Sequence, residues 1–484
     1  MIGKAAATLA LGALLIGSAL PGAALAQRAM AGLSASEKAQ GAQVREQILR
    51  EFGGAVEGPL ADYVRRVGSR VAQVASPGAR PGDYSITVLD SPIPNAMATP
   101  GGYLYITRGL LALMNDEAEL ASVLGHEAGH VAARHSAKSQ RRATLATIGA
   151  IAATVLTGSD LVGAGAQVLG AGVLGQYSQK QEYEADTLGL RYMTETGYDP
   201  FATASMLAAL GRAEIVERGT SAERNRGASW FSTHPLTEAR VARAERLAAE
   251  TGIPPGSRTR NRDAFLAAID GMAWGDAPEQ GLVRGTSFRH AKLGFGFDAP
   301  AGFRLQNSPS AVQGVGPDGS RFVFAGARIA PGRTLDDVAR EAWRKLAGGV
   351  PNTVQVNRTR VNGLETLDTR ARVRGRQGTV DAGITVYRWD GDSAFLFATQ
   401  APAGRLAGLD PLLTSFRRLS AQEARAAGRG RRVEVVTVRP GDTVQSLASR
   451  MAFPDNQLMR FLALNGIENR PLRPGEKLKL IVDG

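Results

Sequence analysis

The feature that most constrains this chain is the sequence HEAGH at residues 126–130, an HExxH pattern. It lies in a proline-free stretch, residues 116–135, which we predict to be one helix. Residues four apart share a helix face, so His126 and His130 can direct two imidazole nitrogens at one Zn²⁺. Glu127 is offset around the helix, where it can take a proton from an attacking water and deliver it to a leaving amine.

A catalytic zinc also needs a third protein ligand, and the candidate is Glu182. It lies in a second predicted helix, on the same face as Asp186, so one carboxylate can bind the metal while the other orients a ligating imidazole. The alternatives are two solvated histidines on an amphipathic helix and an ordinary charged helix face. Histidine usage favours the metal site, because three of the five histidines fall within residues 116–135.

Further motifs follow in the order of a known family. Besides HEAGH and the Glu-x-x-x-Asp pattern, the matching segments are residues 95–107, 109–111 and 232–235. From about residue 40 to about residue 250 the chain resembles zinc metallopeptidase family 48, which includes HtpX, BepA and the CAAX prenyl proteases.

The resemblance implies an α+β fold, with a mainly helical HExxH zincin-type peptidase domain and a small edge sheet. It implies one Zn²⁺ per chain, with His126, His130 and Glu182 as the ligands. In this frame Glu127 is the general base and acid, and Asp186 supports a ligating imidazole from behind.

His234 gains a role only within this resemblance. Taken alone, a histidine before Pro235 is more often a helix-entry residue than a catalytic one. Near the zinc it could donate a hydrogen bond to the oxyanion, or it could bind the open fourth position and hold the enzyme latent. Arg240 is a candidate partner for an acidic residue near the site, with a solvated arginine as the alternative.

The segment before the zinc helix has strand character after a Pro-Gly-Gly turn signal. We predict that it forms a sheet edge to which an extended substrate pairs. The contact residues would be Gly102, Tyr103, Leu104 and Tyr105. An ordinary core strand is the alternative.

Residues 1–26 are typical of a cleaved signal peptide, with an apolar run and an A-x-A site ending at Ala26. We therefore expect export and a periplasmic location. The chain contains no cysteine, so it has neither disulfides nor thiol ligands. A second apolar region, residues 143–175, is interrupted by Asp160, which favours a soluble helical segment over superficial membrane association.

The remaining chain divides by composition. Residues 285–420 show short β-rich segments around one helical stretch, and His290 in this part is expected to be structural. The predicted order is a peptidase domain at 27–252, a linker at 253–284, a small α+β domain at 285–420, a basic linker at 421–433 and a last module at 434–484.

The last module has a strand, two short helices and a final strand, with Pro-Gly turns. This βααβ order resembles a LysM module, which implies binding of peptidoglycan in a shallow groove. The matching groove positions are Gly441, Asp442, Thr443, Asn465 and Gly466. The alternative is a copy that only stabilises the end of the chain.

These features predict a periplasmic zinc endopeptidase that hydrolyses extended or misfolded envelope proteins, with unassembled outer-membrane proteins as one candidate substrate. Peptidoglycan is the expected second partner. Peripheral contact with a membrane is also compatible with the sequence. Nucleic acid is excluded despite a net charge of +12, because the basic residues are spread among acidic ones. A latent or non-enzymatic envelope chaperone or cell-wall-binding scaffold is the alternative, and a cell-wall hydrolase is a third reading.

Overall fold

A computed structural model describes residues 33–76, 82–135, 177–219, 234, 238–375 and 378–484. The predicted signal peptide and the apolar region at 143–175 lie outside the described residues. Within the described part, no helix combines the length and the apolar character needed to cross a bilayer.

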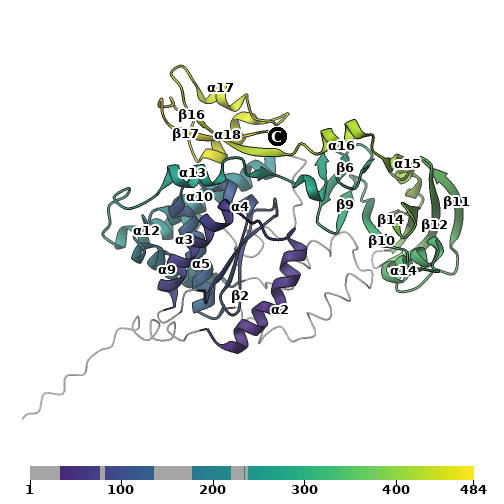
Figure 1. The fold of residues 1–484 in the computed structure, drawn as a ribbon, viewed down its shortest axis with the longest axis horizontal. Helices are drawn as coiled ribbons and strands as arrows, with labels where there is room; N and C mark the ends of the chain where they lie inside the picture. The colour runs from purple at the N-terminus through teal and green to yellow at the C-terminus, as the bar shows by residue number, and fades with distance from the viewer. Residues whose placement is uncertain (1–32, 77–81, 136–176, 220–233, 235–237, 376–377) are drawn as a thin grey trace, which may run out of the picture.

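The peptidase part is α+β, with a small sheet packed against helices (Figure 1). In the sheet, β3 lies between β1, which is parallel to it, and β2, which is antiparallel. The elements are α2 (Ala35–Glu51), α3 (Pro59–Ala75), β1 (Ser85–Leu89), β2 (Ala96–Thr99), β3 (Tyr103–Thr107), α4 (Arg108–Leu113), α5 (Glu117–Ala132), α9 (Gln179–Glu195), α10 (Ala202–Gly219) and α12 (Glu238–Glu250).

The predicted zinc helix is α5, and it ends three residues earlier than the predicted 116–135 stretch. Asp116 caps its start by accepting a hydrogen bond from the Glu119 backbone N–H. At its other end Arg134 has a left-handed backbone conformation, with φ of 53°. This turn stops the helix and redirects the chain just before His135.

The C-terminal module has the predicted βααβ order: β16 (Arg431–Thr437), α17 (Val444–Ala448), α18 (Gln457–Asn465) and β17 (Lys477–Asp483). It lies on the peptidase part and does not stand apart from it (Figure 1). One hydrophobic core contains residues of both, including Leu113, Phe265, Leu478 and Leu480. The module is therefore packed as an integral part of the peptidase body.

The segment predicted as a linker at 253–284 is structured, and this corrects the prediction. It contains α13 (Arg262–Ile269) and β4 (Ala273–Trp274). Phe265, Leu266 and Ile269 lie on one face of α13 and are fully buried, while β4 joins the sheet of the last module in the order β17-β16-β4. The Pro, Gly and charged residues around this helix obscure its short apolar face in the sequence.

The middle part contains the predicted helix, α14 (Leu335–Ala347), packed on one face of a seven-stranded antiparallel sheet. A four-stranded sheet covers the other face through an aromatic core. The strands are β5 (Leu282–Arg284), β6 (Ser287–His290), β7 (Phe295–Asp298), β8 (Arg304–Asn307), β9 (Ala311–Val315), β10 (Arg321–Arg328), β11 (Gln355–Val361), β12 (Leu364–Gly375), β13 (Gly378–Arg388), β14 (Ser393–Pro402) and β15 (Arg417–Arg418).

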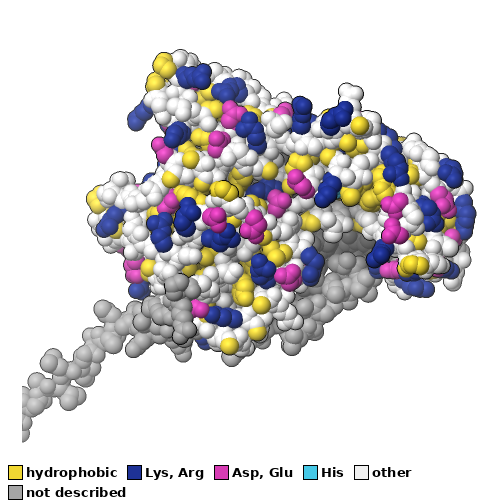
Figure 2. Space-filling view, viewed as in Figure 1, with side chains coloured by type: hydrophobic (Ala, Val, Ile, Leu, Met, Phe, Trp, Pro, Cys, Tyr) yellow, Lys and Arg dark blue, Asp and Glu magenta, His cyan; other side chains and the backbone are white. Residues whose placement is uncertain are grey.

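Two short helices complete the middle part, α15 (Asp410–Ser415) and α16 (Ala421–Ala427). The helix α16 lies inside the predicted basic linker at 421–433, where Ser420 and Glu423 form a capping box. On the face in Figure 2, Lys and Arg side chains alternate with Asp and Glu.

Candidate metal centre

Close packing of α5 against α9 brings the predicted ligands together. A Cβ on Gly189 would lie 2.6 Å from the His126 backbone nitrogen, and a Cβ on Gly125 would lie 2.9 Å from the Gly189 carbonyl oxygen. Gly129, within the HEAGH sequence, faces the Ala185 backbone in the same way. Only glycine allows two backbones to approach this closely, a signal that the sequence reading did not use.

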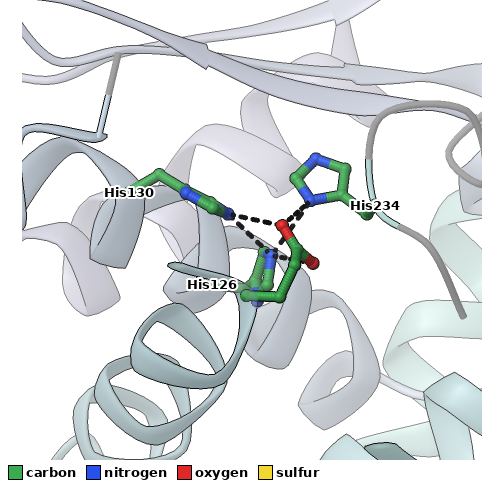
Figure 3. Close-up of side chains that lie close together, drawn as sticks. His126, His130 and His234 are labelled. Carbon is green, nitrogen blue, oxygen red and sulfur yellow. Dashed lines mark hydrogen bonds and ion pairs between the residues drawn. The ribbon is translucent and has the colours of Figure 1, made fainter. Parts of the chain in front are cut away.

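His126, His130 and Glu182 lie together, as predicted, and His234 joins them (Figure 3). All four side chains are buried, and one potential ligand atom from each lies within 4.8 Å of the others. His126 Nε2 is 3.0 Å from His130 Nε2 and 3.3 Å from His234 Nδ1. Glu182 Oε1 is 3.5 Å from His130 Nε2 and 2.9 Å from His234 Nδ1.

These separations are the test of whether the site fits zinc. Tetrahedral zinc with bonds of about 2.0–2.2 Å to nitrogen and oxygen places neighbouring ligand atoms roughly 3.3–3.6 Å apart. Four of the six separations among these atoms run from 2.9 to 3.5 Å, and all six lie within 4.8 Å. Imidazole nitrogen and carboxylate oxygen are also donors that zinc accepts. The residues therefore fit a single zinc ion, with His234 at the fourth corner.

Asp186 takes the predicted place behind a ligand, because its Oδ1 lies 3.0 Å from His126 Nδ1. The prediction that Arg240 has an acidic partner near the site is confirmed. Its guanidinium group contacts the carboxylates of both Asp186 and Glu182. Its Nε and Nη2 donate to Asp186 at 3.0 and 2.8 Å, while Nη1 lies 2.8 Å from Glu182 Oε2. Burial alone would raise the pKa of Asp186, but His126 and Arg240 outweigh it and lower this pKa to about 2.

Glu127 is fully buried, and neither of its carboxylate oxygens accepts a hydrogen bond from the described residues. Its closest ionic contact is His234 Nε2, 3.6 Å from Oε1. Burial raises the pKa of Glu127, the direction that suits a general base and acid working near neutral pH. Burying a carboxylate that accepts no hydrogen bond is costly for a fold, and such groups are concentrated at functional sites.

The prediction that residues 102–105 form a sheet edge is wrong. β3 is flanked on both sides, so its backbone hydrogen bonds are already made to β1 and β2. The edge beside β1 is partly closed by a bridge between Ala55 and Leu89. This leaves β2, which contacts α5, as the edge strand next to the zinc helix.

The predicted glycan-binding residues fall into two groups. Gly441 and Thr443 are exposed, and Asp442 is half-buried beside them. Asn465 is buried: its Nδ2 donates to the Phe461 and Lys479 carbonyls, and its Oδ1 accepts from the Lys479 N–H. The prediction that Asn465 contacts glycan is therefore wrong, because its amide is used inside the module.

Gly466 is exposed at the surface of the module and lies next to the peptidase part. A Cβ at this position would lie 2.9 Å from Arg212 Nη2, on α10, and 3.3 Å from Asn115 Nδ2. One side of the predicted glycan groove thus adjoins the peptidase surface, while the turn around Gly441 is open to solvent.

An HExxH helix, a carboxylate from a second helix and a buried glutamate beside them define a site of the zinc-peptidase class. Residues 60–248 match peptidase family M48, and residues 436–480 match the LysM domain. The chain therefore carries an M48-family peptidase domain and a LysM domain.

Three curated relatives each match a little under half of this chain. The mitochondrial metalloendopeptidase OMA1 of Schizosaccharomyces pombe is 29% identical over 221 residues, covering 45% of this chain and 62% of that protein. The putative β-barrel assembly-enhancing protease of Vibrio cholerae is 30% identical and the β-barrel assembly-enhancing protease of Escherichia coli K12 is 27% identical. The matches cover 46% of this chain in both cases, and 46% and 47% of those proteins, so the chain spans about half the length of these bacterial relatives.

Proposed function

We propose that this protein is a zinc-dependent endopeptidase of the bacterial cell envelope, acting on extended or misfolded polypeptides in outer-membrane protein quality control. The observation that carries the proposal is the buried donor set of His126, His130 and Glu182 next to the unpartnered carboxylate of Glu127. A purely structural zinc site has no need for an adjacent carboxylate, so Glu127, and not the number of ligands, favours a catalytic site. The β-barrel assembly-enhancing proteases among its relatives support the substrate class.

When bound, zinc would polarise the peptide carbonyl and make water a stronger nucleophile. Glu127 would take the proton from the attacking water and return it to the amine that leaves. Asp186 and Arg240 would hold His126 and Glu182 in place through the contacts described above. All of these groups are preorganised in a buried site, where electrostatic interactions are strong.

We place an extended substrate along β2, because a strand edge pairs with a peptide through backbone hydrogen bonds. All four residues of β2 are buried, so a substrate would meet this strand through its backbone edge and not through its side chains. A substrate without stable structure fits this requirement, since only an unfolded segment can add as a strand.

The LysM domain would bring the enzyme to peptidoglycan through the open turn at residues 441–443. Location in the periplasm follows from this partner and from the predicted signal peptide. Because the module shares a core with the peptidase part, it would fix the peptidase at the cell wall with a set orientation.

His234 supports a second, related function. Its Nδ1 occupies the fourth corner of the ligand set, the place that a substrate or water needs during turnover. We infer that the resting protein is latent, with His234 as the latch. In this state the protein could serve as an envelope chaperone or cell-wall-binding scaffold until His234 leaves the site.

The decisive experiment measures zinc content and casein cleavage for residues 27–484 and for two variants, Glu127→Gln and Glu182→Ala. We expect one zinc per parent chain, zinc without activity in Glu127→Gln, and loss of metal in Glu182→Ala. The Gln variant should reduce kcat/KM by about 10²–10⁴-fold. Casein cleavage by Glu127→Gln at the parent rate would contradict the proposal.

A further inference from the structure

His135 is a buried histidine that the proposed mechanism does not use. It is fully inaccessible to solvent and lies just after the end of α5. The left-handed turn at Arg134 brings its ring back toward the zinc helix, where its Nδ1 lies 2.8 Å from His130 Nδ1. Tyr177 stacks on the His130 ring with a centroid distance of 3.8 Å, so the ring is held from its face as well.

The chemistry of an imidazole fixes where the protons on this pair must be. His130 directs Nε2 at the other ligands, 3.0 Å from His126 Nε2, so this nitrogen must keep its lone pair for the metal. Its proton is then on Nδ1, which donates to His135 Nδ1. His135 accepts with Nδ1 and therefore carries its own proton on Nε2.

The Nε2 of His135 points to a carboxylate. It lies 3.4 Å from Glu184 Oε2, on α9, and the Glu184 side chain is 34% exposed. The contacts thus form a chain from His130 through His135 to Glu184. His126 has a simpler arrangement, because Asp186 reaches its Nδ1 directly at 3.0 Å and is itself buried.

We propose that His135 is a positioning residue that fixes the tautomer and ring orientation of His130 and connects this ligand to the carboxylate of Glu184. Ligating histidines usually donate their second N–H to a carboxylate or carbonyl, and losing that partner weakens metal binding about 10–100-fold. Here the anion acts through an intervening imidazole and is partly solvated. The two histidine ligands are therefore supported unequally, with His130 on the weaker side.

This inference rests on the proposed zinc site, and its test is the zinc dissociation constant, measured by competition with a chromophoric chelator. His135→Leu removes the acceptor, whereas His135→Asn keeps one, because Asn Oδ1 stands where His Nδ1 stood. We expect about 10–100-fold weaker zinc binding for His135→Leu and substantial recovery for His135→Asn. Glu184→Gln should weaken binding less than His135→Leu. Glu195→Gln, an exposed change on the same helix, should not alter it.

The cobalt(II)-substituted proteins give an independent readout, because their visible spectra report ligand geometry. We expect altered bands in His135→Leu and parent-like bands in His135→Asn. Equal zinc affinity of His135→Leu and the parent would overturn the inference, as would equal weakening in His135→Leu and His135→Asn. If His135→Leu does not fold, unchanged zinc affinity in Glu184→Gln overturns the connection. A parent that binds no zinc would instead refute the proposed function.

Discussion

The candidate zinc centre and the core of the middle part are both buried, but they consist of opposite kinds of side chain. At the centre, Glu127, Glu182, Asp186 and Arg240 are at most 4% exposed. In the middle part, the core between the two sheets consists mainly of aromatic rings, with Phe297, Phe322, Phe397 and Phe416 fully buried.

This difference in composition has different energetic consequences for the two regions. Burying aromatic surface stabilises a fold directly, and it needs no specific partner. Burying charges is costly unless each is paired, and replacing them with apolar residues often stabilises a protein. The aromatic core therefore stabilises the middle part, whereas the buried charges of the metal centre cost stability and need another explanation. No such buried charge cluster was found among the described residues of the middle part.

The comparison predicts the largest loss at Arg240. Arg240→Leu would leave Glu182 and Asp186 as two buried anions without their cation. We expect the free energy of unfolding of the metal-free peptidase part to fall by about 3–5 kcal/mol. Zinc should recover part of this loss, since its positive charge compensates the same carboxylates. Denaturant unfolding with and without zinc measures both effects.

Arg246→Leu is the matched control, because Arg246 is exposed on the same helix and its loss changes the net charge equally. We expect its unfolding free energy to stay within about 0.5 kcal/mol of the parent. Equal stability of the two variants would show that the centre does not depend on paired burial of charge.

Phe397→Ala makes the corresponding change in the middle part. The ring lies 4.8 Å from Phe324 and 5.1 Å from Phe297, centroid to centroid. We expect a loss of about 3–5 kcal/mol in the unfolding of this part, with zinc affinity unchanged. Val356→Ala is the control, because Val356 on the edge strand β11 is 54% exposed. Weaker zinc binding in Phe397→Ala would mean that the two regions are coupled.

The two regions also differ in what the sequence could predict. Helix periodicity fixes which residues share a face, so His126 could be paired with His130, and Glu182 with Asp186, from spacing. That the two pairs meet was implied by the resemblance to the peptidase family, and the structure brings them together. The strand-rich character of the middle part and its helix α14 were equally readable.

Contacts set by long-range pairing could not be predicted. The central place of β3 depends on β1 and β2, which no local pattern reveals. The burial of Asn465 depends on pairing with the backbone of Lys479 in the last strand, 14 residues later. The position of the His135 ring depends on one left-handed residue, Arg134. These misses share a cause, because each depends on a partner or a dihedral angle outside the periodic pattern.

Lys479 tests whether buried charge also matters where the C-terminal module meets the peptidase part. Its ammonium group is fully buried and donates to the carbonyls of Ala112 and Met114. Burial lowers the pKa of Lys479 to about 7, against a partial opposing effect of Glu119. The other charged groups that act on it are Arg262, Asp116 and Arg212.

The direction of the pH effect follows from proton counting. Between pH 7 and about 10 the unfolded chain holds a proton on Lys479 that the folded protein has lost, so stability rises with pH. Relative to Lys479→Met, the folding equilibrium constant of the parent should increase by at most about tenfold per pH unit. Denaturant unfolding at pH 7, 8 and 9 measures this difference. A parallel pH dependence of the two proteins would contradict it.

The smallest expected effect is that of replacing His234. This substitution should raise proteolytic activity, whereas Arg240→Leu and Phe397→Ala should lower stability. In the aromatic core, removal of a buried ring can only reduce stability, but His234 occupies a position that turnover needs. If nine molecules in ten are latched, His234→Ala should raise casein cleavage roughly tenfold. Cleavage that instead falls, with zinc retained, would assign His234 to the oxyanion. Phe397→Ala, assayed beside it, should leave the rate per folded molecule unchanged, because its ring packs only within the core of the middle part.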